Sequence, residues 1–432
     1  MFTVKTWSLS SLRQKKFLVL FISVSLASLI IFLNLEKSST TSSDALLSRL
    51  KRTVPIKVRP RPYYMSNGKV FPRPAKFSKK LGRRDAKILP EEDPDSDRFE
   101  NQLMFIPPNY YETRNPNKNK TVLLYNGWGG FEKIMVHWFS NRKCPVDTCT
   151  FSLNRSDAET ADFIMFSGQI DGINIKRTPN QIYAFYRLES PIHWPQKYPK
   201  SIVYNWTITY RHDSTISIPY SKWMYYDPRI THQPQIRNFA KNKTKLVAWM
   251  VSNCEAHNDR DAYVRELQKY IQVDVYGACG TMNCTDCHDR LERDYKFYLS
   301  FENSHCADYI SEKVYRNTLG RSIIPVVLGA RKEDYERQLP YNSFIYVEDF
   351  ATPKDLAEYL HKVDKDDVLY NSYFQWRGTG EIHATFEYIW CRICALLHDE
   401  YTMNNPRWYD DINKWWFDPD TLRRGFWRNT KS

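Results

Sequence analysis

The sequence predicts an α/β protein built from two Rossmann-like domains with a cleft between them. From residue 121 onward, short apolar runs alternate with segments of helical spacing, which is the pattern of parallel sheets. The chain has 432 residues, enough for two domains of ordinary size. We expect an N-terminal domain over 111–240, a second domain over 241–370, and a tail over 371–432 that packs back across both.

The expected strands are short runs rich in β-branched and aromatic residues. They are 121–125, 162–166, 182–186 and 201–204 in the first half, and 246–251, 273–276, 296–301, 323–328 and 344–347 in the second. Helical spacing of apolar residues predicts helices over 260–271 and from Ser311 to about Leu319. A third helix is expected from Pro353 to Val363, with proline in the tolerated first turn.

The N-terminus carries a candidate membrane anchor. Residues 17–35 contain no charge and are rich in Leu, Ile, Val and Phe, a length that can just cross a bilayer. Basic residues precede this run, so we expect residues 1–16 to form a cytoplasmic tail. A cleaved signal peptide is the competing interpretation. The apolar run is longer than the core of a typical signal peptide, which favours the uncleaved anchor.

Residues 36–110 are expected to form a stem. Between Arg49 and Lys87 there are 14 Lys or Arg residues and one acidic residue, Asp85, which gives a local charge equal to the whole chain's +13. The rest of the chain therefore has equal numbers of acidic and basic residues, and its charge does not indicate nucleic-acid binding. Prolines and low hydrophobicity predict a solvated spacer. Binding of polyanions or anionic lipid headgroups by this segment is the alternative.

Cysteines and glycosylation sequons indicate the compartment. The chain has nine cysteines, and its sequons are at Asn119, Asn154, Asn205, Asn242 and Asn283. Together with the anchor they predict an oxidising secretory lumen, in which disulfides form. Asn205 would be unglycosylated if it lay inside the cleft. The spacing of Cys284, Cys287 and His288 also fits a haem-attachment pattern, and with Cys391 and Cys394 a split zinc site. Disulfides are favoured over both.

The segment from Tyr295 to Gly329 carries the most information about function. It reads YKFYLSFENSHCADYISEKVYRNTLGRSIIPVVLG, as a strand, a polar loop, a helix and a second strand. A loop that leaves a strand and enters a helix in an α/β unit is where nucleotide-bearing ligands bind. By itself the pair Glu312 and Lys313 would be an exposed ion pair.

The whole string resembles the donor-binding motif of the α1,3-fucosyltransferases, glycosyltransferase family 10. The resemblance rests on FYLSFENS at 297–304, DYISEK at 308–313 and PVVLG at 325–329, with Ser311 where threonine is usual. It extends almost continuously from about Trp206 to Arg377. In the first half it is limited to short pieces, among them ESP at 189–191. The family implies the two-lobed GT-B fold, GDP-fucose as donor and a Golgi location.

The resemblance also implies roles for individual residues. Glu189 corresponds to the carboxylate regarded as the base that deprotonates the acceptor, and one base in a single displacement implies inversion. Lys313 and Arg260 would hold the leaving pyrophosphate. Further GDP-fucose contacts are expected at Tyr210, Arg211, Ser252, Asn253, Glu302, Asn303, Ser304 and Glu312.

The family ties its C-terminus to its first domain through disulfides. It therefore implies that Cys144 and Cys149 bond Cys391 and Cys394, in an order that the sequence leaves open. The other candidates for disulfides are Cys254, Cys279, Cys284, Cys287 and Cys306, an odd number, so at least one should remain unpaired. No bound metal is expected to be obligatory, although a divalent cation such as Mn could stimulate the enzyme. In GT-A glycosyltransferases the metal-binding Asp-x-Asp motif follows an apolar strand. None of the Asp-x-Asp pairs of this sequence does so.

Several alternatives stay open. The acceptor could be an N-acetyllactosamine-type antenna, another terminus that contains GlcNAc, or the innermost GlcNAc of an N-glycan. The tryptophan-rich tail, residues 408–427, is expected to pack in the protein core. The alternative is that its aromatic rings form a surface that binds the acceptor. An inactive, glycan-binding homologue would lack Glu189, Lys313 or Arg260, and all three are present. A Golgi sulfotransferase would need a basic residue in the glycine-rich loop at 126–130. We expect the acceptor to be a glycoprotein or an oligosaccharide. Whether the protein forms a homodimer is left open.

Overall fold

The computed structural model describes residues 61–69, 71, 83–127, 137–168 and 174–423. Contacts divide the chain into two units, residues 1–59 and 60–432, and every described residue belongs to the second. The predicted cytoplasmic tail and anchor, residues 1–35, lie outside the described residues. Among the described helices, none is long and apolar enough to cross a membrane.

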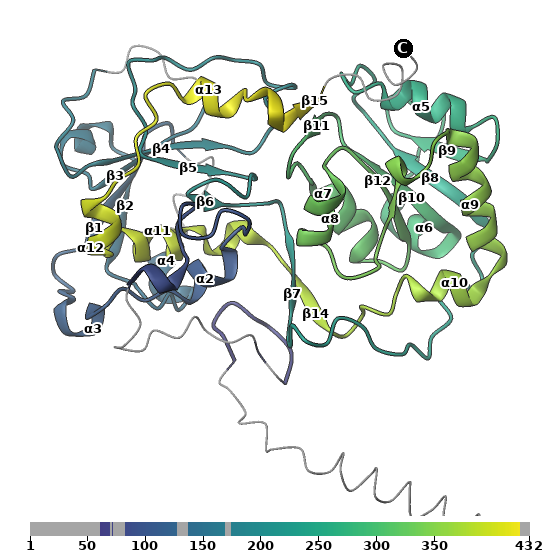
Figure 1. Ribbon diagram of the computed structural model, residues 1–432, viewed down its shortest axis with the longest axis horizontal. Coiled ribbons are helices and arrows are strands. Elements are labelled where there is room, and N and C mark those ends of the chain that lie inside the picture. The colour runs from purple at the N-terminus through teal and green to yellow at the C-terminus, as the bar shows by residue number, and fades with distance from the viewer. Residues whose placement is uncertain (1–60, 70, 72–82, 128–136, 169–173, 424–432) are drawn as a thin grey trace, which may run out of the picture. The chain divides into compact units, whose positions relative to one another are not determined.

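Two fully parallel sheets form the framework of residues 60–432 (Figure 1). The first has the order β2-β1-β3-β4-β5-β6, and the second has the order β13-β12-β10-β8-β9. Strands β3 and β10 are buried along their whole length, which explains why they read as continuous apolar runs. The α/β class with parallel sheets, predicted from the sequence, is confirmed.

The strands have the following bounds. The first sheet contains β1 (Lys120–Leu124), β2 (Cys149–Ser152), β3 (Phe163–Phe166), β4 (Ile182–Arg187), β5 (Trp206–Thr209) and β6 (Ile216–Ser217). The second contains β8 (Lys245–Met250), β9 (Val273–Tyr276), β10 (Tyr295–Phe301), β12 (Ile324–Leu328) and β13 (Ile345–Tyr346). Two small antiparallel pairs join β7 (Lys222–Tyr225) to β14 (Gly380–His383), and β11 (His305–Cys306) to β15 (Leu422–Arg423).

The helices are mostly short. They are α2 (Phe99–Met104), α3 (Tyr110–Thr113), α4 (Trp138–Asn141), α5 (Arg260–Leu267), α6 (Cys287–Asp294), α7 (Glu312–Val314), α8 (Lys332–Gln338), α9 (Pro353–Lys365), α10 (Asp367–Ser372), α11 (Ile389–Leu397), α12 (Glu400–Asn404) and α13 (Ile412–Trp416). Single turns are η1 (Arg83–Ala86), η3 (Arg155–Glu159), η4 (Tyr315–Leu319), η5 (Val347–Asp349), η6 (Thr385–Tyr388) and η7 (Pro419–Thr421). The predicted helix after Ser311 is thus one turn of α7 continued by the π-type turn η4.

One strand prediction is wrong. Residues 201–204 form no strand; Tyr204 makes only an isolated bridge to Tyr409. The strand lies a few residues later, at β5, because its four residues are fully buried beside β4 and pair with it in parallel register. The apolar character of 201–204 instead reflects packing, since Ile202 and Tyr204 are buried under the C-terminal tail near Trp416.

The stem prediction also needs correction. Where the structure describes the segment before residue 110, that segment packs into the core instead of being a solvated spacer. Ile88, Leu89 and Phe105 join the core of the first sheet, and Phe99 and Leu103 on α2 pack with Met224. Apolar residues spaced between the prolines supply this buried surface, which the average composition of the segment conceals.

The C-terminal part of the chain packs under the first sheet. Helix α11 is wholly buried, and two disulfides, Cys144–Cys391 and Cys149–Cys394, attach it beside β2 (Figure 1). Crosslinks between residues this far apart in sequence remove much entropy from the unfolded chain. The final described residues return to the second half, where β15 pairs with β11. Within the tail expected over 371–432, the described helices are α11, α12 and α13, and the described turns are η6 and η7.

The remaining cysteines form two local bridges and one thiol. Cys254 bonds Cys279, and Cys284 bonds Cys287. Cys306, which the sequence included among the disulfide candidates, is a buried free thiol because the other eight cysteines are paired with each other. Cys284 and Cys287 therefore do not form the haem or zinc pattern.

Candidate functional site

The loops that follow β4 and β10 meet at Glu189. This residue lies two positions beyond β4, and Asn303 and Ser304 lie just beyond β10. The Asn303 amide donates to Glu189 Oε1 at 3.4 Å, and the Ser190 and Ser304 hydroxyls are 2.6 Å apart. The carboxyl ends of strands from both sheets therefore bring together residues 114 positions apart. Ligands of open α/β sheets bind at such strand ends.

Tyr309 is a residue of this group that sequence reasoning did not select. Its hydroxyl donates to Glu189 Oε1 at 2.7 Å, and its ring packs 5.0 Å from that of Tyr210. The side chain is almost fully buried. Its position inside the DYISEK string, as the one aromatic residue of a polar segment, is the signal that could have identified it.

Glu302 and Lys313 form a buried ion pair beside this meeting point. Glu302 is 1% exposed and accepts from the Ser311 N–H at 2.7 Å, the Ser311 hydroxyl at 2.8 Å and Lys313 Nζ at 2.8 Å. Burial, which lowers the pKa of Lys313, is outweighed by the Glu302 charge, which raises it. The ammonium group is therefore held charged at a fixed place, with part of the side chain still exposed.

Gly329, directly after β12, makes room for Glu302. Its φ is +139°, and an added Cβ would lie 2.6 Å from the Cβ of Glu302. Any other residue here would displace the buried carboxylate. The glycine that closes the PVVLG string is therefore explained by the close approach of Glu302.

Arg260 joins the loops after β8 and β10. It lies at the start of α5, is 3% exposed, and donates to the carbonyls of Phe301 at 2.9 Å and Asn253 at 2.8 Å. Its Nε has no hydrogen-bond partner among the described residues. Asn253 is half-buried, and its side chain accepts from the Glu255 N–H, while Ser252 is exposed. These residues line the same strand-end region as Asn303.

Three predicted donor contacts make no hydrogen bond to Glu189, Asn303 or Lys313 among the described residues. Tyr210 is 1% exposed and packed among aromatic rings. Arg211 is also buried, forms two bonds to Asp213 and one to the Trp415 carbonyl, and so ties β5 to the tail. Glu312 is exposed at the first position of α7. Tyr210 therefore contacts the Glu189 group through the Tyr309 ring, but both Tyr210 and Arg211 are enclosed by protein and offer little surface to a ligand.

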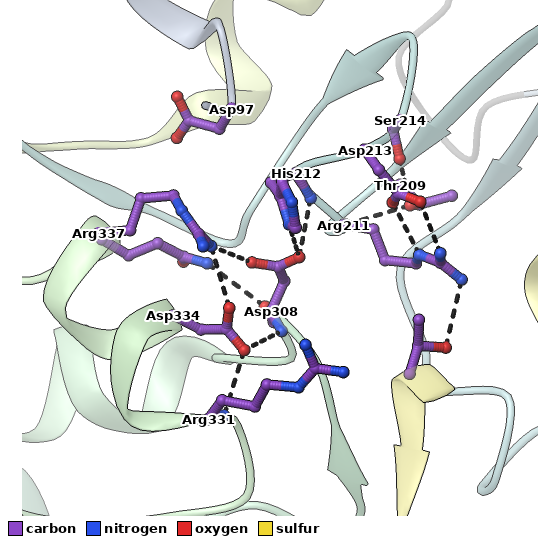
Figure 2. A network of polar contacts seen from close by, with 12 residues as sticks. Asp97, Thr209, Arg211, His212, Asp213, Ser214, Asp308, Arg331, Asp334 and Arg337 are labelled. Atoms are coloured by element: carbon purple, nitrogen blue, oxygen red, sulfur yellow. Dashed lines mark hydrogen bonds and ion pairs between the residues drawn. The ribbon is translucent and has the colours of Figure 1, made fainter. Parts of the chain in front are cut away.

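A second polar cluster lies around Asp308 (Figure 2). Asp308 Oδ2 is 2.5 Å from His212 Nδ1 and accepts from the His212 N–H at 2.9 Å. Its other oxygen accepts from Arg337 Nη1 at 2.7 Å, and that nitrogen also bonds Asp334 at 3.0 Å. His212 follows β5 of the first sheet, while Arg337 and Asp334 lie on α8 of the second half. The cluster therefore joins the two halves of the structure.

The charges in this cluster influence each other's titration. Burial would raise the pKa of Asp308, but the bond to His212 and its charge hold that pKa below the ordinary value. Burial lowers the pKa of His212, but the hydrogen bond and charge of Asp308 outweigh it and raise the pKa. For Asp334 the charge of Arg337 does not outweigh the opposing effects. Burial and the neighbouring charge of Asp308 raise the pKa of Asp334 to about 6.

Two groups of side chains have the spacing of metal ligands among the described residues. One consists of Cys149, Cys394 and His398, but the two cysteines share a disulfide. The other consists of His212, Asp308 and Asp334, where Arg337 Nη1 bonds both carboxylates. A guanidinium already supplies the positive charge there, so neither donor set is suited to a cation.

The structure also bears on the sequons. Asn119, Asn154, Asn242 and Asn283 are exposed, as glycosylation requires. Asn205 is 1% exposed, and its side chain accepts from the Tyr183 N–H at 3.1 Å and donates to the Arg407 carbonyl at 2.9 Å. This burial favours the alternative stated for Asn205, that it is unglycosylated, because the folded protein leaves no room for a glycan at this amide.

Comparison with known proteins identifies the family. Residues 240–415 match the family described as glycosyltransferase family 10 (fucosyltransferase) C-term, and residues 117–221 match fucosyltransferase, N-terminal. The chain is 50% identical over 382 residues to glycoprotein 3-alpha-L-fucosyltransferase A of Drosophila melanogaster, covering 86% of this chain and 75% of the relative.

Two further relatives are more distant. Alpha-(1,3)-fucosyltransferase C of Drosophila melanogaster is 32% identical over 341 residues, which cover 70% of this chain and 79% of the relative. The 4-galactosyl-N-acetylglucosaminide 3-alpha-L-fucosyltransferase 9 of Bos taurus is 35% identical over 314 residues, with coverage of 70% and 85%. Both domains of the family and most of the first relative's length are thus represented, and the chain belongs to the fucosyltransferases of glycosyltransferase family 10.

Proposed function

We propose that the protein transfers L-fucose from GDP-fucose, in α1,3 linkage and with inversion, to a GlcNAc residue of a glycoprotein glycan. The observation that carries this proposal is the meeting of Glu189 with the Asn303–Ser304 loop, beside the fixed charge of Lys313. A base from one half of the structure and a donor-binding loop from the other are then adjacent. This is the arrangement that a transfer between two substrates in one GT-B cleft requires.

Glu189 acts as the general base in this scheme. The acceptor hydroxyl gives its proton to the Glu189 carboxylate while its oxygen bonds to C1 of fucose, and the bond from C1 to the GDP oxygen breaks. The Tyr309 hydroxyl and the Ser190 N–H, 2.7 Å and 3.0 Å from Glu189 Oε1, fix the orientation of the carboxylate. The second oxygen of Glu189 is then the one that faces the acceptor.

Lys313 stabilises the charge that develops on the departing GDP. Cations held in place before the reaction need no reorganisation when charge appears on the phosphate. Glu302 accepts hydrogen bonds from Ser311 and Lys313, and it thereby fixes the position of the Lys313 ammonium group. Arg260 supports the loops after β8 and β10 through the Phe301 and Asn253 carbonyls. We propose that no resident metal is obligatory for these roles.

The acceptor class is supported by the names of the relatives. The relative with 50% identity is named for a glycoprotein acceptor, whereas a relative with 35% identity is named for 4-galactosyl-N-acetylglucosaminide. We propose a glycoprotein acceptor and leave open whether its fucosylated GlcNAc is antennal or innermost. We further propose that residues 17–35 anchor the chain in the Golgi membrane, with the enzyme in the lumen.

The test is a transfer assay with a panel of acceptors. The purified full-length chain is incubated with GDP-fucose and three acceptors of matched length, which carry N-acetyllactosamine, a GalNAc–GlcNAc terminus or a core N-glycan. Mass spectrometry and linkage analysis should show one α1,3-linked fucose on a GlcNAc of one acceptor class. A fucose in another linkage, or GDP-fucose binding without transfer to any glycan, would contradict the proposal.

A further inference from the structure

A second hollow lies at the outer edge of the second sheet. It encloses about 660 Å³, a size typical of small-molecule sites, and lies between β13, α8 and α9. In sheet order β13 is two strands away from β10, which carries the Asn303 loop. Glu189, Tyr309 and Lys313 are not among the residues that line this hollow. It is therefore separate from the site described above.

Aromatic rings supply half of the lining of this hollow. They are Tyr225, Tyr341, Phe344, Tyr346, Phe350, Tyr359 and Tyr373. Isolated exposed aromatic residues are common on protein surfaces, but a group around one concavity indicates a binding surface. Tyr341 is 59% exposed, so its ring is available to a ligand.

The exposed ring of Tyr341 and the partly buried rings beside it are held in place before any ligand arrives. The Tyr341 N–H donates to the Tyr225 hydroxyl at 2.8 Å, and the Tyr341 ring packs against His232. Phe350 packs against Tyr359, whose hydroxyl is 2.6 Å from that of Tyr373. A ligand would therefore pay little entropy for ordering this surface.

The charges around the hollow disfavour an anionic ligand. Lys332 Nζ lies 2.8 Å from both oxygens of Asp349, so this cation is already neutralised. Glu336 remains as an additional carboxylate among the lining residues. Asn342 and Thr231 add neutral donors and acceptors at the rim. A nucleotide, a phosphate or a sialylated group would meet a net negative lining.

An extended peptide is also a poor match. A peptide that adds to a sheet edge needs a run of unpaired backbone groups. The edge strand β13 has only two residues and passes directly into the turn η5. A neutral sugar matches better, because a pyranose ring has an apolar C–H face that stacks on an aromatic ring and hydroxyls that bond amides and carboxylates.

We propose that this hollow, lined by Tyr341, Phe350 and Tyr359, is a second carbohydrate site that binds a neutral oligosaccharide. The binding itself does not depend on the catalytic proposal. If that proposal also holds, a glycoprotein acceptor occupies this site with one glycan branch and the Glu189 site with another. The two contacts then raise the effective concentration of the reacting branch.

The test is photo-crosslinking with peptide mapping on the full-length chain. The probe is a neutral N-acetyllactosamine tetrasaccharide with a diazirine at its reducing end, with its sialylated form for comparison. Trypsin separates the hollow (peptide 338–354) from the Glu189 loop (peptide 188–197). The neutral probe should label peptide 338–354, and the sialylated probe should label it less.

Variants make the result specific. Tyr341→Ala should reduce labelling of peptide 338–354 by roughly fivefold, from the loss of one aromatic stacking contact. Tyr111→Ala is the matched control, since Tyr111 is 56% exposed and distant in sequence, and should leave labelling unchanged. Tyr359→Phe removes only the hydroxyl paired with Tyr373 and should also weaken labelling.

The outcomes separate this inference from the catalytic one. Labelling confined to peptide 188–197, no labelling at all, or labelling of 338–354 that Tyr341→Ala does not change would overturn the second site. Labelling of 338–354 in a preparation that transfers no fucose would uphold the second site and count against the catalytic proposal alone.

Discussion

Glu302 and Asp308 are buried carboxylates six residues apart, and their partners differ. Each is 1% exposed. Glu302 bonds Ser311 and Lys313, which belong to the same local segment. Asp308 bonds His212 from the loop after β5 and Arg337 from α8. A buried carboxylate can therefore either position one functional cation or join two halves of a protein, and its partners indicate which role it has.

The largest expected effect of this difference is on stability. Asp308→Asn should lower the free energy of unfolding by about 3 kcal/mol, because it leaves His212 without its buried counter-charge and Arg337 with Asp334 alone. Asp308 has a positive φ of 63°, which asparagine also tolerates, so the substitution isolates the charge. Urea unfolding at pH 6 measures the change.

The control for this prediction is an exposed carboxylate. Asp286 pairs with Arg290 at 3.3 Å, and its side chain is 42% exposed. Asp286→Asn should change the free energy of unfolding by less than about 0.5 kcal/mol. Similar losses for Asp308→Asn and Asp286→Asn would show that the cluster does not hold the two halves together.

Glu302→Gln should affect donor binding more than stability. It removes the charge that fixes Lys313, so the ammonium group is no longer preorganised for a phosphate. We expect the Kd for GDP-fucose, measured by calorimetry, to rise about tenfold. The loss of unfolding free energy should be smaller than for Asp308→Asn. The distinction between the two carboxylates would be wrong if Asp308→Asn raised the Kd for GDP-fucose more than Glu302→Gln does. It would also be wrong if Glu302→Gln lowered the free energy of unfolding more than Asp308→Asn does.

The smallest effect is a dependence of stability on pH. The pKa of His212 is raised in the folded protein, because the hydrogen bond and charge of Asp308 outweigh burial. Its contribution is therefore complete below the unfolded pKa of about 6.5 and is lost as the pH rises through the folded pKa. Between pH 6 and pH 9 the wild type should lose about 1 kcal/mol more than His212→Gln. Parallel curves for the two proteins would contradict the assignment.

Asp334 acts in the same direction over a lower range. Its pKa of about 6 lies above the unfolded value, so the folded state binds more protons and stability falls as the pH rises through that range. Asp308, whose pKa is lowered, has the opposite sign and loses its contribution in acid. Comparing His212→Gln with the wild type above pH 6 separates the histidine from both carboxylates.

The same contrast explains what the sequence could predict. Glu302, Ser311 and Lys313 lie within a short string whose strand, loop and helix are locally encoded, so their proximity was predictable. His212 and Asp308 are 96 residues apart, and neither has a local pattern that reveals the other. The string DYISEK marks Tyr309 as a candidate, but its partner could not be predicted, since its bond to Glu189 spans 120 positions.

Predictions made from average composition were less successful than predictions made from the pattern of apolar residues. The apolar runs located β4, β8 and β10 closely, because strands buried on both faces must be continuously apolar. The average charge and proline content of residues 36–110 concealed Ile88, Phe99 and Phe105, which are buried. The apolar residues of 201–204 pack against the tail instead of forming a strand, and sequence does not show this contact between distant residues.

The most direct test of the account is the rate of fucose transfer by Glu189→Gln at saturating GDP-fucose, with the Kd for GDP-fucose measured on the same preparation. Glutamine retains the acceptor oxygen for the Tyr309 hydroxyl but cannot take the proton. Glu387→Gln, at a side chain 48% exposed, controls for surface effects. We predict a 10²- to 10⁴-fold loss of rate, as is typical for removal of a general base, with Kd within about twofold. A rate within about tenfold of the wild type, under the same conditions, would contradict the assignment of Glu189 as the base.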